Sequence, residues 1–346
     1  MRRNVVIIHP GALGDVLLAL PAMRALRASF PLHEHLLIAS SEVGKLLQTC
    51  AEVDRAIAIE GSAFATLLAA GATVPADLRA YLNRCDLFVC WMGDAGGDLA
   101  STLHGLGAQR VIFRSPFDGQ WEGLHQSDRF LETVRDVIRP GDYRSALRLP
   151  GSAVTRARGL ITGTGGPGLG VVALHPGSGS QHKCCQPSLF GAACRELFAR
   201  SYTPILLGGP ADDTTLAGAV TECTEPPPIF TGLDLVSIAG LLAYVDLYVG
   251  HDSGLTHLAA ALHRPTIALF GPTQVQRWAP NGDHVRILTG DTCRCHTWAE
   301  VRNCQGKPCL DIAAERLIHA CAAMIHQHRP LDADPVWSGP APCSDR

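Results

Sequence analysis

The sequence predicts an α/β protein built from two Rossmann-like halves that face each other across a ligand-binding cleft. Short apolar runs alternate with helical stretches along the chain, which is typical of parallel sheets covered by helices. A glycine-rich segment, 162–168, interrupts this alternation, and the pattern restarts beyond it. We therefore expect a first domain over 1–160, a second over 161–328, and a disordered proline-rich tail over 329–346.

Composition supports two domains and excludes several classes of protein. A chain of 346 residues holds about two domains of roughly 100–200 residues each. Hydrophobic residues make up 47% and charged residues 18%, which excludes a disordered chain. The net charge of −3 argues against binding to nucleic acid through bulk charge. Apolar runs are too short for a membrane-spanning helix or a signal peptide, so we expect a cytoplasmic protein with at most peripheral membrane contact.

The expected elements follow one another in a regular order. In the first half, apolar runs predict strands at 5–9, 35–39, 55–59, 86–90 and 110–113, with helices between them, the first over 15–28. In the second half, strands are expected at 171–175, 204–207, 246–250 and 266–270. Helices are expected there at 188–200, 214–221, 235–243, 253–262 and 312–328.

The first candidate motif, HPGALGDV at 9–16, runs from a strand through a glycine turn into a helix. Its glycines allow a backbone or a ligand to approach closely, and Asp15 falls at the start of the helix. It lacks the glycine spacing of a dinucleotide-binding turn and the lysine of a phosphate loop. Asp15 is therefore either a functional carboxylate or an ordinary helix-capping residue.

The second candidate motif, HPGSGSQHK at 175–183, also leaves a predicted strand. A turn of glycine and serine, which includes Ser178, offers backbone N–H groups to an anion, and Lys183 adds a positive charge just beyond it. These features favour phosphate binding, with a plain surface turn as the alternative.

The third candidate motif, GHDSGLTHLAAAL at 250–262, combines a strand end with the start of a helix. Unpaired N–H groups and the helix dipole attract anions to such a position. His257 is either a core histidine or a member of the site, because it lies one turn beyond Ser253. A further glycine turn, FGPT at 270–273, follows the next strand. Turns that share the carboxyl edge of a parallel sheet indicate a nucleotide site there.

Cysteine is abundant, with 13 residues in the chain. We expect most of them to be small core residues, among them Cys50, Cys85, Cys90, Cys194, Cys223 and Cys321. One cluster is denser and comprises Cys293, Cys295, Cys304 and Cys309. Four thiolates are able to close a tetrahedral metal site, but the spacing lacks paired C-x-x-C knuckles. We expect a cysteine-rich loop without a ligand, with a metal site or disulfides as the alternatives.

Taken together, the motifs resemble glycosyltransferase family 9, which contains the ADP-heptose:lipopolysaccharide heptosyltransferases. The segment GDVL at 14–17, followed by Leu20 and Pro21, is similar to the opening motif of the family. HPGS at 175–178, with Lys183 beyond it, is similar to its central motif. DSGLTHLAAAL at 252–262, followed by FGPT, is similar to its most specific motif.

The resemblance implies a GT-B fold, with the acceptor on the N-terminal domain and a nucleotide-sugar on the C-terminal domain. It implies inverting transfer, with Asp15 as the general base and Lys183 as the cation that neutralises the leaving diphosphate. It also implies a set of donor-binding residues: Ser178 and His257 in the motifs, Asp213 at the ribose, Leu233 at the base, Asp252 at the sugar, and Ser253, Gly254, Leu255 and Thr256 at the phosphates.

No cofactor or metal is expected, since the D-x-D sequence at 332–334 lies in the tail. The expected partners are an ADP-heptose-like donor and a glycan or lipid-linked glycan acceptor, without nucleic acid. Two alternatives remain open: a sugar-nucleotide epimerase or hydrolase of the same fold, and a non-catalytic nucleotide-sugar-binding protein.

Overall fold

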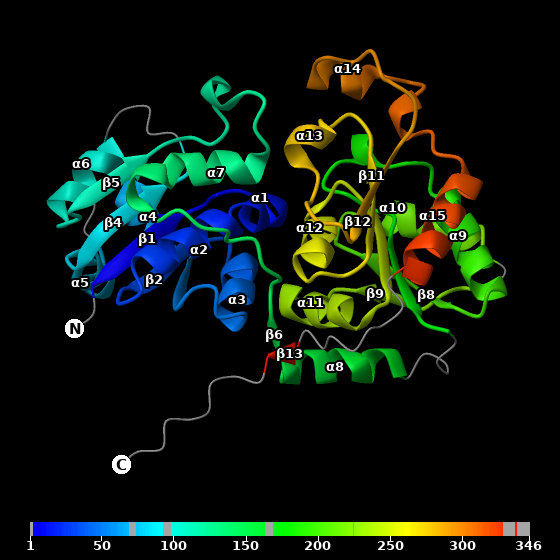
Figure 1. Cartoon of the computed structure of the whole chain (residues 1–346), viewed down its shortest axis with the longest axis horizontal. Helices are drawn as coiled ribbons and strands as arrows, with labels where there is room; N and C mark the ends of the chain where they lie inside the picture. Colours follow the sequence, from blue (N-terminus) through cyan, green and yellow to red (C-terminus); the bar gives the residue numbers. More distant parts are fainter. Residues whose placement is uncertain are drawn as a thin grey trace. The chain divides into compact units, whose positions relative to one another are not determined.

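The computed structural model describes residues 3–68, 74–92, 98–162, 169–223, 225–327 and 336–337. The chain divides into two compact units, Met1–Ser145 and Ala146–Arg346, and each contains a parallel sheet with helices around it (Figure 1). The predicted α/β class with two Rossmann-like domains is therefore confirmed. The glycine-rich segment 163–168, the D-x-D sequence at 332–334 and nearly all of the predicted tail lie outside the described residues.

Unit 1 has a sheet with the strand order β3-β2-β1-β4-β5 among its described residues. Its strands are β1 (Asn4–Ile8), β2 (Glu34–Ala39), β3 (Arg55–Ala58), β4 (Cys85–Cys90) and β5 (Arg110–Phe113). Its helices are α1 (Leu13–Leu18), α2 (Leu20–Ser29), α3 (Ser41–Thr49), α4 (Ser62–Leu68), α5 (Ala76–Leu82), α6 (Asp98–Gly105) and α7 (Gln126–Val134). Single 3-10 turns occur at Gly119–Trp121 and Arg135–Val137.

The core of unit 1 lies on both faces of this sheet. Val6 and Ile8 of β1 pack in one cluster with residues of α4, α5 and α6, including Phe64 and Leu103. Helices α2 and α7 contact each other elsewhere in the unit (Figure 1). Five-residue strands buried along their whole length, such as β1, are typical of parallel sheets covered on both sides.

The first predicted helix, 15–28, is two helices in the structure. Helix α1 ends at Leu18, and α2 begins at Leu20 with Pro21 in its first turn. Proline has no backbone N–H to donate and fits best at a helix start. Pro21 therefore favours a new helix at this point over a continuation of α1.

Unit 2 has a six-stranded parallel sheet with the order β12-β11-β10-β7-β8-β9, and a short pair β13-β6. Its strands are β6 (Leu149–Pro150), β7 (Val171–His175), β8 (Thr203–Gly208), β9 (Ile229–Thr231), β10 (Leu247–His251), β11 (Thr266–Phe270), β12 (Val285–Thr289) and β13 (Val336–Trp337). Its helices are α8 (Gly151–Thr162), α9 (Ser188–Ala199), α10 (Asp213–Thr221), α11 (Leu235–Tyr244), α12 (Gly254–Ala261), α13 (Val275–Trp278), α14 (Trp298–Asn303) and α15 (Ala314–Gln327). Short 3-10 turns lie at Gln181–Lys183 and Pro308–Leu310.

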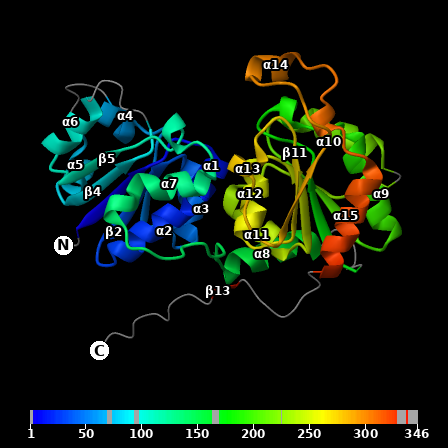
Figure 2. The ribbon, with the colours of Figure 1, turned by 45° about the horizontal axis from the view of Figure 1, so that its top comes forward.

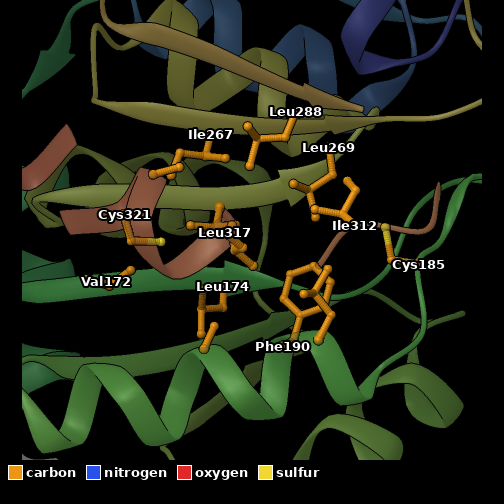
Figure 3. Close-up of a cluster of buried hydrophobic side chains, with 14 of the residues drawn as sticks. Val172, Leu174, Cys185, Phe190, Ile267, Leu269, Leu288, Ile312, Leu317 and Cys321 are labelled. Carbon is orange, nitrogen blue, oxygen red and sulfur yellow. The ribbon is translucent and has the colours of Figure 1, made fainter. Parts of the chain in front are cut away.

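The main core of unit 2 lies between its sheet and the helices α9 and α15. Figure 3 shows Phe190 of α9 and Leu317 of α15 among strand residues such as Leu174 and Leu269. All four side chains have no measurable exposure to solvent. Burial of such a side chain contributes about 1.5–3 kcal/mol to the stability of the fold. This apolar layer therefore stabilises the strands whose carboxyl ends carry the candidate site.

The chain divides between the two units at a different residue from the one that the sequence predicted. The division falls after Ser145 and not at residue 160, so α8 belongs to unit 2. Helix α8 packs against α11, where a Cβ atom at Gly240 would lie 2.6 Å from the carbonyl oxygen of Ala153. The absence of a side chain at Gly240 allows this close helix contact, which sequence composition does not reveal.

Strands β9 and β12 were not predicted. Both lie at the edges of their sheet, and their residues are mostly half-buried or exposed. An edge strand needs no continuous apolar run, which is the signal that identified the central strands. Among the described helices, none has the length and apolar character needed to cross a membrane.

Candidate functional site

Both sheets have the strand order of a Rossmann fold, and this order fixes where a ligand binds. In unit 2 the strands after β7 are added on one side of it up to β9, and those from β10 to β12 on the other side, so the order reverses between the adjacent parallel strands β7 and β10. Ligands of open α/β sheets bind at such a switch point, beyond the carboxyl ends of the strands. The second and third sequence motifs follow β7 and β10 directly, so the fold brings them together at this point.

His251 holds the two motif segments in place. Its Nε2 atom accepts a hydrogen bond of 2.8 Å from the backbone N–H of Cys185, and its Nδ1 lies 3.2 Å from the carbonyl oxygen of Gly177. These partners require a neutral ring with its proton on Nδ1. Burial lowers the pKa of His251 to about 4, consistent with that neutral state. The end of β10 is thereby fastened to the loop that follows β7.

His175 forms a second buried contact at the same edge. Its Nε2 lies 3.0 Å from Oδ2 of Asp212, which also accepts a 2.7 Å bond from the N–H of Gly209. Burial alone would raise the pKa of Asp212, but the hydrogen bonds from His175 and Gly209 bring the pKa below its ordinary value. A Cβ atom at Gly177 would lie 2.0 Å from Oδ1 of Asp212, so only glycine fits there.

The charged centre of the site is a pair formed by Lys183 and Asp252. Lys183 Nζ donates to Asp252 Oδ2 at 2.8 Å, and the side chains are 24% and 8% exposed. His257 Nε2 lies 3.9 Å from the other carboxylate oxygen of Asp252. Ser178 donates its hydroxyl to the carbonyl oxygen of Asp252 at 2.8 Å. The partly exposed ammonium group is thus held at the mouth of a largely buried network.

Helix α12 begins beside this pair. Its N-cap residue, Ser253, makes no side-chain capping hydrogen bond within the described structure, and its hydroxyl lies 3.3 Å from that of Thr256. The Thr256 hydroxyl donates to the carbonyl oxygen of His251, which fixes the turn. Ser253, Gly254 and Leu255 are half-buried. The first turn of α12 therefore presents backbone N–H groups and a positive dipole end near Lys183.

Asp213 and Leu233 follow the other two strands on this side of the switch point. Asp213 is the exposed first residue of α10, which comes after β8, and Leu233 is half-buried between β9 and α11. All these strands are parallel, so both residues lie at the same edge of the sheet as Lys183. Neither has the network of contacts that Asp212 has.

Asp15 lies in unit 1, in the first turn of α1, and is half-buried. His9, directly after β1, packs on Trp91 and Phe130 with ring centroids 5.6 and 5.2 Å away. Burial lowers the pKa of His9 to about 4. A Cβ atom at Gly11 would lie 2.7 Å from His9 Cε1 and 2.9 Å from Asp15 Cβ, so glycine allows this close approach.

The structure brings most of the predicted donor-site residues into one network and adds two that the motifs did not single out. Hydrogen bonds, close polar contacts or adjacent turns link Ser178, Lys183, Asp252, Ser253, Thr256 and His257. Asp212 and His251 were missed. A signal for Asp212 was present in the paired aspartates that follow a Gly-Gly turn at 208–209, but only the fold decides which of the two faces inward.

Comparison with known proteins first establishes the fold. A glycosyl transferase family 9 structure from Veillonella parvula has a TM-score of 0.78, at 16% identity, covering 94% of this chain and 98% of that one. The E. coli ADP-heptose lps heptosyltransferase II has a TM-score of 0.72, at 18% identity, covering 94% and 100%. A dodecameric E. coli glycosyltransferase described as iron-containing has a TM-score of 0.56, at 13% identity, covering 95% and 80%. The chain has the GT-B fold.

Sequence comparison then shows which proteins the second half of the chain resembles. Residues 162–306 match the model of glycosyltransferase family 9 (heptosyltransferase). Lipopolysaccharide heptosyltransferase 3 of Escherichia coli is 31% identical over 131 residues, which are 36% of this chain and 38% of that protein. The match thus covers well under half of the length of that curated relative. The predicted resemblance to glycosyltransferase family 9 is confirmed.

Proposed function

We propose that this protein is an inverting glycosyltransferase that moves a sugar from a nucleotide donor to an acceptor hydroxyl. The observation that carries the proposal is the Lys183–Asp252 pair at the start of α12, at the switch point of unit 2. An ammonium group has three N–H donors, so Lys183 can keep its hydrogen bond to Asp252 and still donate to a phosphate oxygen. Lysine and a helix N-terminus together stabilise the negative charge that a diphosphate leaving group develops.

The donor that we propose is ADP-heptose or a closely similar nucleotide-sugar. Two similar proteins bear names that specify heptosyl transfer, and one of these names includes ADP-heptose. Asp213 follows β8, the neighbour of β7, and Leu233 follows β9, the strand beyond β8, at the edge that also carries Lys183. An exposed carboxylate suits ribose hydroxyls, and an aliphatic side chain suits the face of a base. The phosphates would then lie on Ser253, Gly254, Leu255 and Thr256, with the sugar towards Asp252.

In the proposed reaction Asp15 is the general base. It takes the proton from the acceptor hydroxyl, whose oxygen attacks the anomeric carbon in a single displacement. The bond from that carbon to the diphosphate oxygen breaks, and the nucleoside diphosphate leaves with the bonding electron pair. A single displacement inverts the configuration of the anomeric carbon. A half-buried carboxylate after a strand end, as Asp15 is, suits this role.

The acceptor that we propose is a hydroxyl of a lipopolysaccharide-type glycan, reached at the cytoplasmic face of a membrane through peripheral contact. Transfer proceeds without a catalytic metal or other cofactor, because Lys183 and α12 supply the positive charge that Mg²⁺ supplies elsewhere. This part of the proposal is tested by adding Mg²⁺ or Mn²⁺ to dialysed enzyme. A strong increase in rate would contradict it.

Calorimetric titration with ADP-, UDP- and GDP-sugars tests donor binding directly. We expect ADP-sugars to bind, and binding by none of them would refute the proposal. Product analysis then separates the activities. Incubation with the donor alone should leave it largely intact, whereas an epimerase or a hydrolase would convert it. Binding without transfer to any lipopolysaccharide-derived acceptor would favour a non-catalytic binding protein.

A further inference from the structure

The cysteine-rich loop of unit 2 has a feature that the proposed transfer does not use. The loop joins β12 to α15 and carries α14, which stands apart from the helices that cover the sheet (Figures 1 and 2). Its cysteines occupy separate positions: Cys293 and Cys295 precede α14, Cys304 follows it, and Cys309 lies in the 3-10 turn Pro308–Leu310. The fold nevertheless brings the thiols of Cys293, Cys295 and Cys304 together, with Cys309 beside Cys293.

The distances between the thiols suit the binding of a single ion. The sulfur atoms of Cys293, Cys295 and Cys304 all lie within 4.8 Å of one another, and those of Cys293 and Cys295 are 3.2 Å apart. Cys309 is not in this group of three, but its thiol interacts electrostatically with that of Cys293. Four sulfur atoms about 2.3 Å from a metal lie about 3.8 Å apart at the corners of a tetrahedron. Three of the thiols already have suitable spacings, and Cys309 completes a tetrahedron when its side chain moves closer to them.

The backbone around the cluster is built to hold it. The N–H groups of Gly290 and Asp291 donate to the carbonyl oxygens of Cys309 and Pro308, both at 2.9 Å. These bonds fasten the two ends of the loop together. A Cβ atom at Gly290 would lie 2.2 Å from the carbonyl oxygen of Pro308, so the close approach requires glycine.

The cluster also has a buried side and a fixed helix. Cys309 is 8% exposed and belongs to the core of unit 2, and Cys293 packs against that core. Thr297 and Glu300 form a capping box, with two reciprocal hydrogen bonds, that fixes the start of α14 between Cys295 and Cys304. A loop that served only as a connection would not need this cysteine content.

We propose that Cys293, Cys295, Cys304 and Cys309 bind one zinc or iron ion through four thiolates. Tetrahedral sulfur sites select these soft or borderline metals. On binding, the ion displaces the protons of the thiols, which pass to solvent. Four protein ligands leave no open coordination position, so the site is structural and takes no part in the chemistry of transfer.

The site would fix a segment that touches the donor network. The ring of Trp298 in α14 lies 6.0 Å from Lys183 Nζ, and Lys307 Nζ donates to the carbonyl oxygen of Gln181 at 3.3 Å. Gln181 and Lys183 share the 3-10 turn of the second motif. Loss of the metal should therefore loosen α14 beside Lys183. Only this consequence for donor binding rests on the proposed function.

Elemental analysis of the full-length protein, purified under reducing conditions without a chelator, tests the site. We expect about one zinc or iron ion per chain, retained on desalting, and native mass spectrometry should show the same single addition. After removal of the metal, Co²⁺ should restore a tetrahedral thiolate absorption spectrum. Zinc and iron are distinguished by the elemental analysis, and either result supports the proposal.

Matched variants locate the ligands. Cys304→Ser should lose the metal, whereas Cys223→Ser, a half-buried cysteine outside the cluster, should retain it. Circular dichroism checks that both variants fold. If Cys304→Ser fails to fold, the metal stoichiometry of the wild-type protein still tests the proposal. A metal-free protein that also fails to bind Co²⁺, two disulfides among the four cysteines, or full metal content in a folded Cys304→Ser variant would overturn the proposal. Donor titration is a separate measurement, so its failure would leave this result intact.

Discussion

The two units have the same three residues at the end of the first strand of their main sheet and use them differently. His9-Pro10-Gly11 follows β1 in unit 1, and His175-Pro176-Gly177 begins at the last residue of β7 in unit 2. In unit 1 the histidine packs on the rings of Trp91 and Phe130. In unit 2 it pairs with the carboxylate of Asp212 at 3.0 Å. One backbone arrangement thus supports an aromatic cluster in one unit and a polar network in the other.

The glycine has a common purpose in both units. At Gly11 a Cβ atom would contact His9 and Asp15, and at Gly177 it would overlap Asp212. Each glycine therefore lets a carboxylate approach the turn closely. The neighbours of that carboxylate decide its chemistry: Asp212 is buried against His175, whereas Asp15 is half-buried and retains access to solvent. A partly accessible carboxylate suits proton transfer, and a buried, paired one suits support of the loop.

The largest expected effect comes from Asp15→Asn, which tests the chemical role given to unit 1. Loss of a general base lowers transfer by roughly 10²–10⁴-fold. The donor affinity measured by calorimetry should stay unchanged, because this residue acts on the acceptor. Asp118→Asn, at an exposed aspartate of the same unit, is the matched control and should keep normal activity. Normal turnover by Asp15→Asn would remove it as the base.

The next effect tests the charged pair of unit 2. Lys183→Ala removes an electrostatic contact to the leaving group and should lower kcat by roughly 10²–10³-fold. Donor binding should weaken as well, which Asp15→Asn does not cause. Lys183→Arg should recover part of the rate because it keeps the charge. Lys45→Ala, at an exposed lysine of α3, serves as the control; an equal loss there would point to a general effect of charge.

Acid should destabilise both units through their buried histidines. In the folded protein the pKa of both His9 and His251 is about 4, against 6.5 for the unperturbed side chain. Between these values the unfolded chain binds more protons, so stability is complete above pH 6.5 and falls as the pH drops towards 4. Each histidine contributes about 3 kcal/mol across that window, at 1.36 kcal/mol per pKa unit.

Chemical denaturation at pH 7.5, 6.5, 5.5 and 4.5 measures this loss. His9→Phe should remove the part of this pH-dependent loss of stability that His9 causes, and leave the part that His251 causes. A free energy of unfolding that is constant over this range would contradict the assignment of neutral buried rings. The same slope in His9→Phe and in the wild type would show that His9 does not contribute.

The smallest expected effect tests the glycine of the second motif. Gly177→Ala forces a Cβ atom against Asp212 and should cost about 1–3 kcal/mol of stability, as overpacking does. Gly179, two residues on, has no neighbour within 4 Å of its Cβ position. Gly179→Ala should therefore change stability by no more than about 0.5 kcal/mol. Thermal unfolding compares the two, and equal losses would show that the turn is not confined by Asp212.

The sequence alone determined the class of fold, most of the central strands and the motif positions. Strands such as β1, β7 and β10 are buried on both faces, so their apolar runs stand out in the sequence. Edge strands β9 and β12 carry no such run, so the sequence did not reveal them. The first predicted helix is divided in the structure, with Pro21 at the start of its second part. The glycine and serine turns were visible because only particular residues allow such turns.

Only the tertiary structure decided which residues meet. The resemblance named Asp213 for the ribose, and the structure adds its neighbour Asp212, whose carboxylate turns inward to His175, since adjacent residues at a helix start point in different directions. The assignment of α8 to unit 2 rests on its contact with Gly240, far away in the chain. Convergence of the cysteine thiols likewise depends on the hydrogen bonds that close the loop ends. Local patterns specify elements, but packing between distant segments specifies the site.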